Sequence, residues 1–354
     1  MPKRRPIWRW TRRILIVSLI LNGVLVIIGV TYQAIATAID ARKFQPPGQL
    51  VDVGGYRLHI NCIGEGTPTV VMESGCGGSS LDWCFVQPAV AQFTRACTYD
   101  RAGYGWSDPG PTPRVGQRVV SELHALLTKA GIEGPYVLVG HSLGGLYIRL
   151  YASQYPDEAA GMVLVDTTHE DLISRLSSNE RRLQAAFVWL VRLTRITAPL
   201  GIPRLFGRSA FLMEVPEQIK PMADAVGFRS KAYSAMFEEI AAMRLIMAEV
   251  GSARARDPRP DWPLVVLTQG FAHLNSLNLP SDSPDMRLPK VLMELQTDLT
   301  RLSSNSTHII AKKSNHYIHL DQPDLVIDAI RRVVESVREN SSLAQKAGSG
   351  RHLD

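Results

Sequence analysis

The sequence is poor in cysteine and lacks the usual motifs for metals and cofactors. Its 354 residues include four cysteines, too few for a disulfide-dense scaffold, and none of them form a C-x-x-C pair of the kind that holds structural zinc. The chain also lacks an H-E-x-x-H motif, a phosphate-binding loop and a dinucleotide-binding fingerprint. We therefore expect neither a metal ion nor a cofactor.

The excess of positive charge is confined to residues 1–13. The net charge is +6, and this segment holds six basic residues and no acidic one, so the rest of the chain is balanced at 33 of each sign. Nucleic-acid-binding domains spread basic residues over their folded surface, so we expect no nucleic-acid partner. The hydrophobic content of 45% excludes a mainly disordered chain.

One long hydrophobic run is present, at residues 14–39, and it contains 26 residues without a charge. About 20 apolar residues cross a bilayer core as a helix, so the run predicts a transmembrane anchor. Trp8 and Trp10 precede it, where interfacial aromatic residues are common. By the positive-inside rule, the basic tip at 1–13 stays cytoplasmic and the rest of the chain is extracytoplasmic.

Two alternatives to the anchor remain open. A cleaved signal peptide would release a secreted domain, although its apolar part is usually about 7–15 residues long. A buried helix of a soluble protein is the other. Residues 40–48, DARKFQPPG, are polar and rich in proline, which predicts a linker between the membrane and a folded domain.

The folded part alternates short apolar runs with helical patterns, which predicts an α/β fold with a mostly parallel sheet. Helices are expected at 115–132, 144–156 and 324–340. Strands are expected at 50–55, 56–64, 68–74, 96–105, 136–142, 161–166, 263–270 and 307–314. Residues 170–260 contain only helical patterns and predict a cap over the sheet, and the tail at 341–354 predicts disorder.

The strongest chemical signal is the G-x-S-x-G motif that runs from Gly140 to Gly144. It follows an apolar strand and opens a helix, which is the setting in which such a turn exposes a serine as a nucleophile. We therefore expect Ser142 to be the nucleophile rather than part of an ordinary glycine-rich turn. His141, beside it, is interpreted as a variable position.

A serine hydroxyl needs a neighbouring base. His316, in SNHYIHLDQP, lies between the last predicted strand and the last predicted helix, from where it can reach the same edge of the sheet. His319 is its competitor, and it has the alternative of packing within a helix.

Four segments resemble the α/β-hydrolase superfamily, in particular its esterase- and lipase-like branch with a helical cap. They are VVMESGCGGSSLDW, YDRAGYGWSD, YVLVGHSLGGLYIRLYA and NHYIHLDQP. The resemblance implies an α/β-hydrolase domain at 49–340, an eight-stranded sheet, a cap inserted after the sixth strand and a Ser–acid–His triad. The resemblance also implies that dehalogenases and epoxide hydrolases of this fold use an aspartate as the nucleophile. A serine at position 142 argues against both of these activities.

The oxyanion hole is expected from two backbone amides. One belongs to Leu143, which follows the nucleophile, and the other to the loop after the third strand. Relatives often have His-Gly-X there, and Ser74-Gly75-Cys76 stands in its place, so Cys76 is the expected donor and Gly77 the alternative. The alternative interpretation is that the glycine-rich loop after the third strand is only a flexible turn, without a role in an oxyanion hole.

The acid of the triad is expected at Asp166, where the sixth strand ends. The loop after the seventh strand, the more common position among relatives, offers no carboxylate in LTQGFAHLNSLN. Glu170, Asp171 and Asp298 are competitors, and Asp166 has the alternative role of a turn cap. Asp100 and Arg101 are interpreted as an ion pair that holds the YDRAGYG loop near the nucleophile.

These residues predict a serine hydrolase of carboxylic esters, with Ser142, His316 and Asp166 as its catalytic residues and lipid-like or other hydrophobic esters as its favoured substrates. An amide or lactone hydrolase and a cofactor-free peroxidase would use the same triad. A non-catalytic binding or scaffold protein is the alternative from another class. The expected partners are a small ester substrate and the bilayer.

The resemblance also implies that the second and fourth strands are neighbours. Cys62 and Cys97 lie on these strands, so they are able to face each other. An extracytoplasmic domain would keep a disulfide between them oxidised, and such a bond is one of two interpretations that remain open. Two small buried thiols are the alternative.

Overall fold

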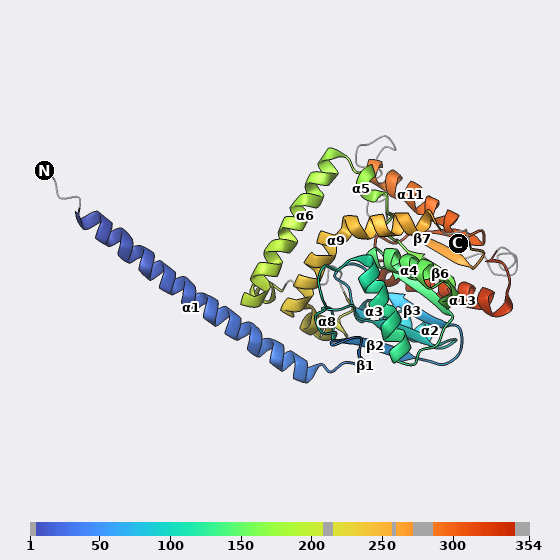
Figure 1. The fold of residues 1–354 in the computed structure, drawn as a ribbon, viewed down its shortest axis with the longest axis horizontal. Coiled ribbons are helices and arrows are strands. Elements are labelled where there is room, and N and C mark those ends of the chain that lie inside the picture. Colours follow the sequence, from blue (N-terminus) through green and yellow to red (C-terminus); the bar gives the residue numbers. More distant parts are fainter. Residues whose placement is uncertain (1–4, 208–214, 257–259, 272–285, 344–354) are drawn as a thin grey trace.

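The computed structural model describes residues 5–207, 215–256, 260–271 and 286–343. Helix α1 (Arg5–Lys43) is a long helix whose N-terminal part projects from an α/β body (Figure 1). The first four residues of the basic tip and residues 344–354 of the expected disordered tail lie outside the described part.

The body is built on one eight-stranded sheet in the order β1-β2-β4-β3-β5-β6-β7-β8. Strand β2 pairs antiparallel with β1 and β4, and all other neighbours are parallel. The strands are β1 (Gln49–Asp52), β2 (Arg57–Ile63), β3 (Thr69–Glu73), β4 (Ala96–Tyr99), β5 (Tyr136–His141), β6 (Ala159–Val165), β7 (Leu264–Gln269) and β8 (Ser306–Ala311). The expected eight strands and their mostly parallel arrangement are confirmed.

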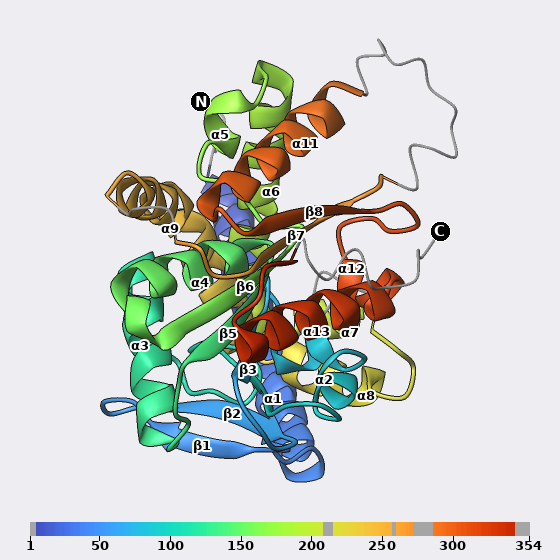
Figure 2. The same ribbon diagram turned by 90° about the vertical axis from the view of Figure 1, so that its right-hand side faces the viewer.

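Helices cover both faces of the sheet (Figure 2). Residues 70–72 and 137–139 are fully buried, as expected for strands with helices on both sides. One core lies under α3 (Gly116–Lys129) and α4 (Leu143–Gln154), and the other under α2 (Gln87–Val90) and α13 (Pro323–Glu339). The 3.6-residue repeat of apolar side chains places the buried face of each helix on the sheet.

The helical block after β6 is the feature predicted as a cap at 170–260. It contains α5 (Leu172–Arg175), α6 (Ser178–Thr197), α7 (Ile202–Leu205), α8 (Lys220–Gly227) and α9 (Ser230–Arg254). Between β7 and β8 the structure adds α11 (Arg287–Leu299), which the sequence pattern did not predict. Leu288, Leu292, Leu295 and Leu299 follow the spacing of one helix face, and Leu295 and Leu299 are buried, so the sequence did contain a signal for this helix.

Helix α1 extends beyond the expected anchor at 14–39. It continues to Lys43, because none of the residues before Pro46 breaks a helix, and Asp40 forms an ion pair with Arg204 of the cap at 2.7 Å. The part predicted as a linker therefore begins as helix. By length and composition α1 is a candidate membrane span, with a mean hydropathy of 2.7 in its most apolar window.

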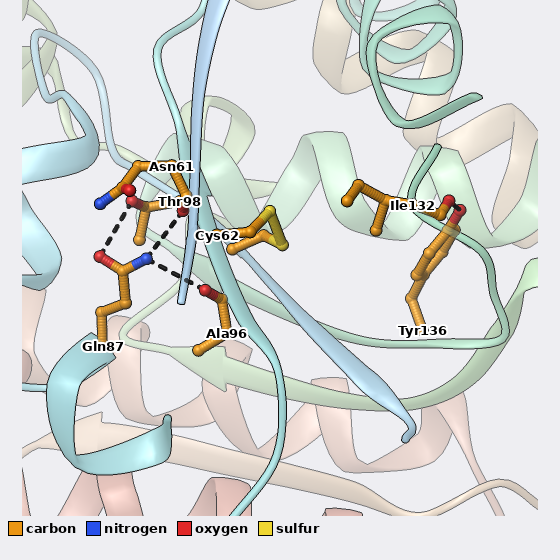
Figure 3. Close-up of a disulfide and its surroundings, with 8 residues drawn as sticks. Asn61, Cys62, Gln87, Ala96, Thr98, Ile132 and Tyr136 are labelled. Carbon is orange, nitrogen blue, oxygen red and sulfur yellow. Dashed lines mark hydrogen bonds between the residues drawn. A yellow bond between two sulfur atoms is a disulfide. The ribbon is translucent and has the colours of Figure 1, made fainter. Parts of the chain in front are cut away.

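Cys62 and Cys97 form a disulfide, which is the first of the two interpretations that the sequence left open (Figure 3). These residues are direct partners in the antiparallel register of β2 and β4, with their Cα atoms 4.1 Å apart. Gln87 of α2 ties the same strands together, because its side-chain amide donates to the carbonyl oxygens of Asn61 and Ala96.

Candidate active site

The turn between β5 and α4 carries Ser142 in a strained conformation. Its φ is 52° and its ψ is −121°, a region that side chains other than glycine rarely adopt. A Cβ atom at Gly144 would lie 2.6 Å from the backbone oxygen of Glu73, and one at Gly140 would lie 2.8 Å from the backbone of Gly145. The two glycines of the motif therefore permit the close approach that the sharp turn requires.

Ser142, His316 and Asp166 form a chain of hydrogen bonds. The Nε2 atom of His316 lies 3.0 Å from the Oγ atom of Ser142, and its Nδ1 atom lies 2.6 Å from the Oδ2 atom of Asp166. Because a carboxylate only accepts, the proton of the neutral ring belongs on Nδ1, which leaves Nε2 free to accept from the hydroxyl.

Asp166 is held firmly at the end of β6. It is 6% exposed, its φ is 42°, and its Oδ1 atom accepts a hydrogen bond of 2.9 Å from the backbone amide of Gln269 on β7. The side chain of His316 is 40% exposed, so the site opens to solvent on the histidine side.

His319, the competitor for the base, occupies a different place. It is fully buried against Trp83, with ring centroids 4.9 Å apart, and neither ring nitrogen has a hydrogen-bond partner among the described residues. Burial, together with the nearby His316, lowers the pKa of His319 to about 3. His319 is therefore a neutral packing residue in this fold.

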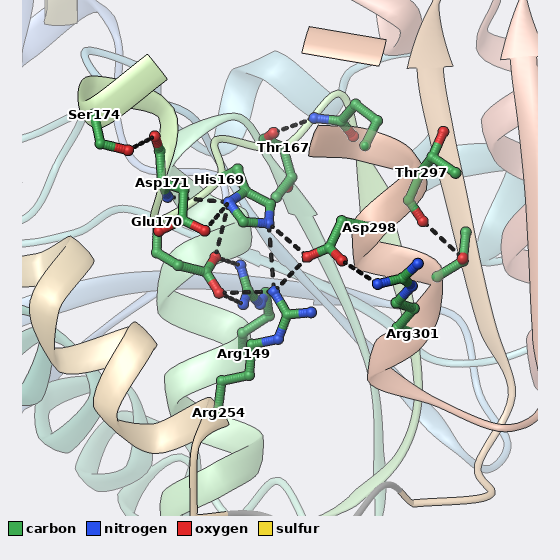
Figure 4. A network of polar contacts seen from close by, with 12 residues as sticks. Arg149, Thr167, His169, Glu170, Asp171, Ser174, Arg254, Thr297, Asp298 and Arg301 are labelled. Atoms are coloured by element: carbon green, nitrogen blue, oxygen red, sulfur yellow. Dashed lines mark hydrogen bonds and ion pairs between the residues drawn. The ribbon is translucent and has the colours of Figure 1, made fainter. Parts of the chain in front are cut away.

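The competing acids belong to a separate polar cluster (Figure 4). Asp298 lies 2.7 Å from Arg254 and 3.2 Å from His169, while Glu170 pairs with Arg149 at 2.7 Å. Asp171 follows in the same cluster, where its backbone amide donates to His169. Burial acts to raise the pKa of Asp298, but the hydrogen bond and charge of Arg254 outweigh it and lower that pKa. Among the described residues, none of these acids forms a hydrogen bond or an ion pair with Ser142 or His316.

The same cluster borders a cavity of about 520 Å³. Arg149, Arg254, Trp262 and Leu302 are among its lining residues, which come from the second half of α4, the end of α9 and the segments that precede β7 and β8. It therefore lies at the opposite edge of the sheet from the serine turn. In the described ranges, no three histidine, cysteine, aspartate or glutamate side chains are placed so that they could hold a metal ion together.

The loop after β3 lies against the serine turn, as expected for an oxyanion loop. A Cβ atom at Gly75 would lie 3.2 Å from the Cβ atom of Ser142. The backbone amides of Cys76 and Leu143 donate to no other residue in the part of the chain that the structure covers, and the same holds for Gly77. Burial raises the pKa of the Cys76 thiol, so this cysteine stays protonated and is a poor nucleophile.

The interpretation of Asp100 and Arg101 as a mutual pair is wrong. Asp100 instead lies 2.8 Å from His59 and accepts from the amides of Ser80 and Trp106. Arg101 pairs with Glu73 at 2.5 Å and with Glu239 of α9 at 2.6 Å. Adjacent side chains on an extended segment point in opposite directions, which is why the two neighbours find different partners.

Arg101 also holds the loop after β3, which is the candidate oxyanion loop. Its guanidinium donates to the backbone oxygens of Ser74 at 2.7 Å and Gly75 at 2.8 Å. Neither Glu73 nor Glu239 was predicted as a partner of Arg101 from the sequence. For Glu73, the available signal was its position as an acidic residue at the end of the buried strand β3.

His141 was also missed as a contributor to the site. Burial lowers its pKa strongly, so the ring is neutral, and its Nε2–H donates to the backbone oxygen of His316 at 3.0 Å. This residue therefore fixes the loop that carries the candidate base.

A sequence-family model described as the alpha/beta hydrolase fold matches residues 68–208. The chain is 27% identical to the "Probable transporter efuK" of Hormonema carpetanum over 84% of its length, and 25% identical to an "AB hydrolase superfamily protein" of Gibberella zeae over 77%. An uncharacterized protein of Schizosaccharomyces pombe is 25% identical. The chain spans 44% of the Hormonema protein, 56% of the Schizosaccharomyces protein and 87% of the Gibberella protein.

Solved structures share the fold at lower identity. An ancestral haloalkane dehalogenase superposes with a TM-score of 0.64 at 16% identity, covering 82% of this chain and 99% of that one. A thermophilic esterase from Thermogutta terrifontis gives 0.56 at 22% identity, covering 82% and 98%. With the sheet order, the cap after β6 and the serine turn described above, these matches show that the chain has the α/β-hydrolase fold.

Proposed function

We propose that this protein is a serine hydrolase of carboxylic esters. The hydrogen-bonded chain from Ser142 through His316 to Asp166 carries the proposal, because it joins a nucleophile, a base and an acid in the order that acyl transfer needs. Structures with this fold include dehalogenases and an epoxide hydrolase. A serine at the turn, rather than a carboxylate, favours acyl transfer over those reactions.

The reaction proceeds in two halves. The Nε2 atom of His316 takes the hydroxyl proton of Ser142 as its Oγ atom attacks the ester carbonyl, and the amides of Cys76 and Leu143 stabilise the resulting oxyanion. His316 then protonates the leaving alcohol, and an acyl-enzyme remains. Water, deprotonated by His316, releases the acid and restores Ser142, while Asp166 stabilises the imidazolium at each stage.

We further propose that α1 anchors the protein in a membrane with its N-terminus cytoplasmic and the hydrolase domain outside. The hydropathy of α1 supports a span, and the basic residues before it support this orientation. The Cys62–Cys97 disulfide supports an oxidising compartment. A membrane-bound hydrolase with an apolar cap favours lipid-like or other hydrophobic esters as substrates.

The test uses the full chain purified in detergent and a series of p-nitrophenyl esters of increasing acyl length. We expect hydrolysis that disappears in Ser142→Ala and is retained in Ser80→Ala, a nearby buried serine outside the hydrogen-bonded chain. Equal hydrolysis by wild type and Ser142→Ala would overturn the proposal, and so would the absence of hydrolysis across the whole series.

A further inference from the structure

Helix α6 of the cap exposes an apolar face that no described part of the chain covers. Only Val191 is buried on this helix. Trp189 is 66% exposed and Leu183 is 72% exposed, values unusual for such large apolar side chains. We define the cap apolar face as Leu183, Phe187, Trp189, Leu190, Leu193 and Ile196.

The charges around this face are mostly positive. Helix α6 contains four arginines and one acidic residue, Glu180, which is paired with Arg287. Arg181, Arg182 and Arg192 are exposed, and the guanidinium of Arg192 lies 5.1 Å from the ring centroid of Trp189. An apolar face bordered by arginines is typical of helices that lie in the interface of an anionic bilayer.

The end of α6 is fixed to α1. A Cβ atom at Gly29 of α1 would lie 2.7 Å from the backbone oxygen of Leu200, just beyond the end of α6. Gln33 of α1 donates to the backbone oxygen of Phe228 at 2.7 Å, and Asp40 pairs with Arg204. Contact between α1 and the cap thus begins near Gly29, and the more N-terminal, apolar part of α1 is exposed.

This arrangement determines where α6 lies relative to a membrane that α1 enters. Figure 1 shows α6 along the side of the body from which α1 projects, and Figure 2 places both helices behind the sheet. Leu205 and Phe206, which follow shortly after α6, are 67% and 75% exposed and extend the apolar surface toward α1.

We propose that the cap apolar face rests in the headgroup–acyl boundary of the leaflet that α1 enters, with its arginines on anionic phospholipid. This inference rests on the proposed anchoring by α1 and deepens the proposed function. The cap is thereby held at the leaflet, and hydrophobic esters enter the site from the bilayer rather than from water.

A second copy of the chain fits this face less well than a bilayer does. A symmetric contact would bring Arg181, Arg182 and Arg192 of both copies together without acids to oppose them, and like charges at close range disfavour such contacts. Anionic phosphates complement the same residues.

The experiment uses the full chain reconstituted in vesicles of phosphatidylcholine and phosphatidylglycerol. The signal of Trp189 is the difference in fluorescence between wild type and Trp189→Phe, since the chain has six tryptophans. We expect lipids brominated near the top of the acyl chain to quench most of this signal, and aqueous iodide to leave it nearly unchanged. Quenching by iodide alone would overturn the proposal. A Trp189 signal that neither quencher reaches, together with crosslinked dimers, would overturn it in favour of a second copy.

Paired variants test the consequence for substrates. Leu190→Asp combined with Leu193→Asp should reduce hydrolysis of a long-chain ester dissolved in the vesicles by roughly tenfold, from the apolar burial lost at two side chains. Hydrolysis of a soluble short-chain ester should be unchanged. Ile310→Asp is the control, because Ile310 is a similarly exposed apolar residue on the edge strand β8. An equal loss in the control, or no loss in the paired variant, would contradict leaflet access.

The same samples distinguish failure of this proposal from failure of the proposed function. If wild type hydrolyses neither ester but bromolipid quenches Trp189, the docking is supported and the esterase function is rejected. If wild type fails to float with the vesicles, both the anchoring by α1 and the docking are rejected.

Discussion

Arg101 and Glu239 form a two-point ion pair that joins the cap to the sheet. The Nε atom of Arg101 lies 2.6 Å from one carboxylate oxygen of Glu239, and its Nη2 atom lies 3.1 Å from the other, with both side chains buried. The same guanidinium donates to the backbone oxygens of Ser74 and Gly75 in the loop beside Ser142. The position of the cap and the geometry of the proposed oxyanion loop are therefore coupled through one side chain.

Glu239→Gln should weaken this coupling, because it removes one charge from the buried pair. We expect kcat for a short ester to fall about tenfold with a smaller change in KM, and the free energy of unfolding to fall by about 3 kcal/mol. Glu238→Gln is the matched control, since Glu238 pairs with the partly exposed Arg195. Full kcat in a destabilised Glu239→Gln variant would show that the network is structural only.

Asp166→Asn should lower kcat by about 10⁴-fold without unfolding the protein, because an amide favours the wrong tautomer of His316. Steady-state kinetics on a p-nitrophenyl ester measures this loss. Asp298→Asn should change kcat only slightly, since Asp298 contacts Arg254 and His169 instead. The reverse ranking of the two variants would move the acid to Asp298.

His319 should make the protein less stable in mild acid. Its folded pKa of about 3 lies below the usual value of 6.5, so the unfolded chain binds the extra proton first as the pH falls. Neutral His319 therefore contributes fully to the free energy of unfolding well above pH 6.5. This contribution falls progressively below pH 6.5, and about 2 kcal/mol of it is lost at pH 5.

Thermal unfolding at several pH values tests this slope. His319→Leu should flatten it between pH 6.5 and 5, because the side chain that takes up a proton on unfolding is then absent. Buried His141 contributes in the same direction, so part of the slope remains in His319→Leu. An identical slope in wild type and His319→Leu would reject this role.

The disulfide should stabilise the body, because it closes a loop with a sequence separation of 35 residues. Cys62→Ser with Cys97→Ser should reduce the free energy of unfolding by about 3 kcal/mol, as loop-closure entropy predicts. Cys84→Ser, at a free cysteine, is the control. Denatured, unreduced protein from the cells that produce it naturally should contain two reactive thiols. Four thiols would contradict both the disulfide and the extracytoplasmic placement.

Local patterns were sufficient to predict the sheet and the residues that meet at its edge. Ser142 and Asp166 directly follow strands β5 and β6, and the loop after β8 carries His316, so parallel pairing alone brings the three side chains to one edge. The nearness of Cys62 and Cys97 had a different basis, because it came from the strand order that the family resemblance implied.

Contacts that depend on the third dimension were not predictable from the sequence. Glu239 lies 138 positions from Arg101, and no local signal connects them. The bond from His141 to the backbone of His316 depends on how two loops pack. The contact of α1 with Leu200 likewise depends on how the cap packs in three dimensions, which no local pattern specifies.

The central claim is that Ser142 is a nucleophile activated by His316. Its most direct test is reaction of the full chain with a fluorophosphonate, followed by mass spectrometry of the digested protein. We predict one adduct, on Ser142, which is absent in Ser142→Ala and forms orders of magnitude more slowly in His316→Ala. An adduct on another residue, such as Cys76, or equally fast labelling of Ser142 in His316→Ala, would contradict the account.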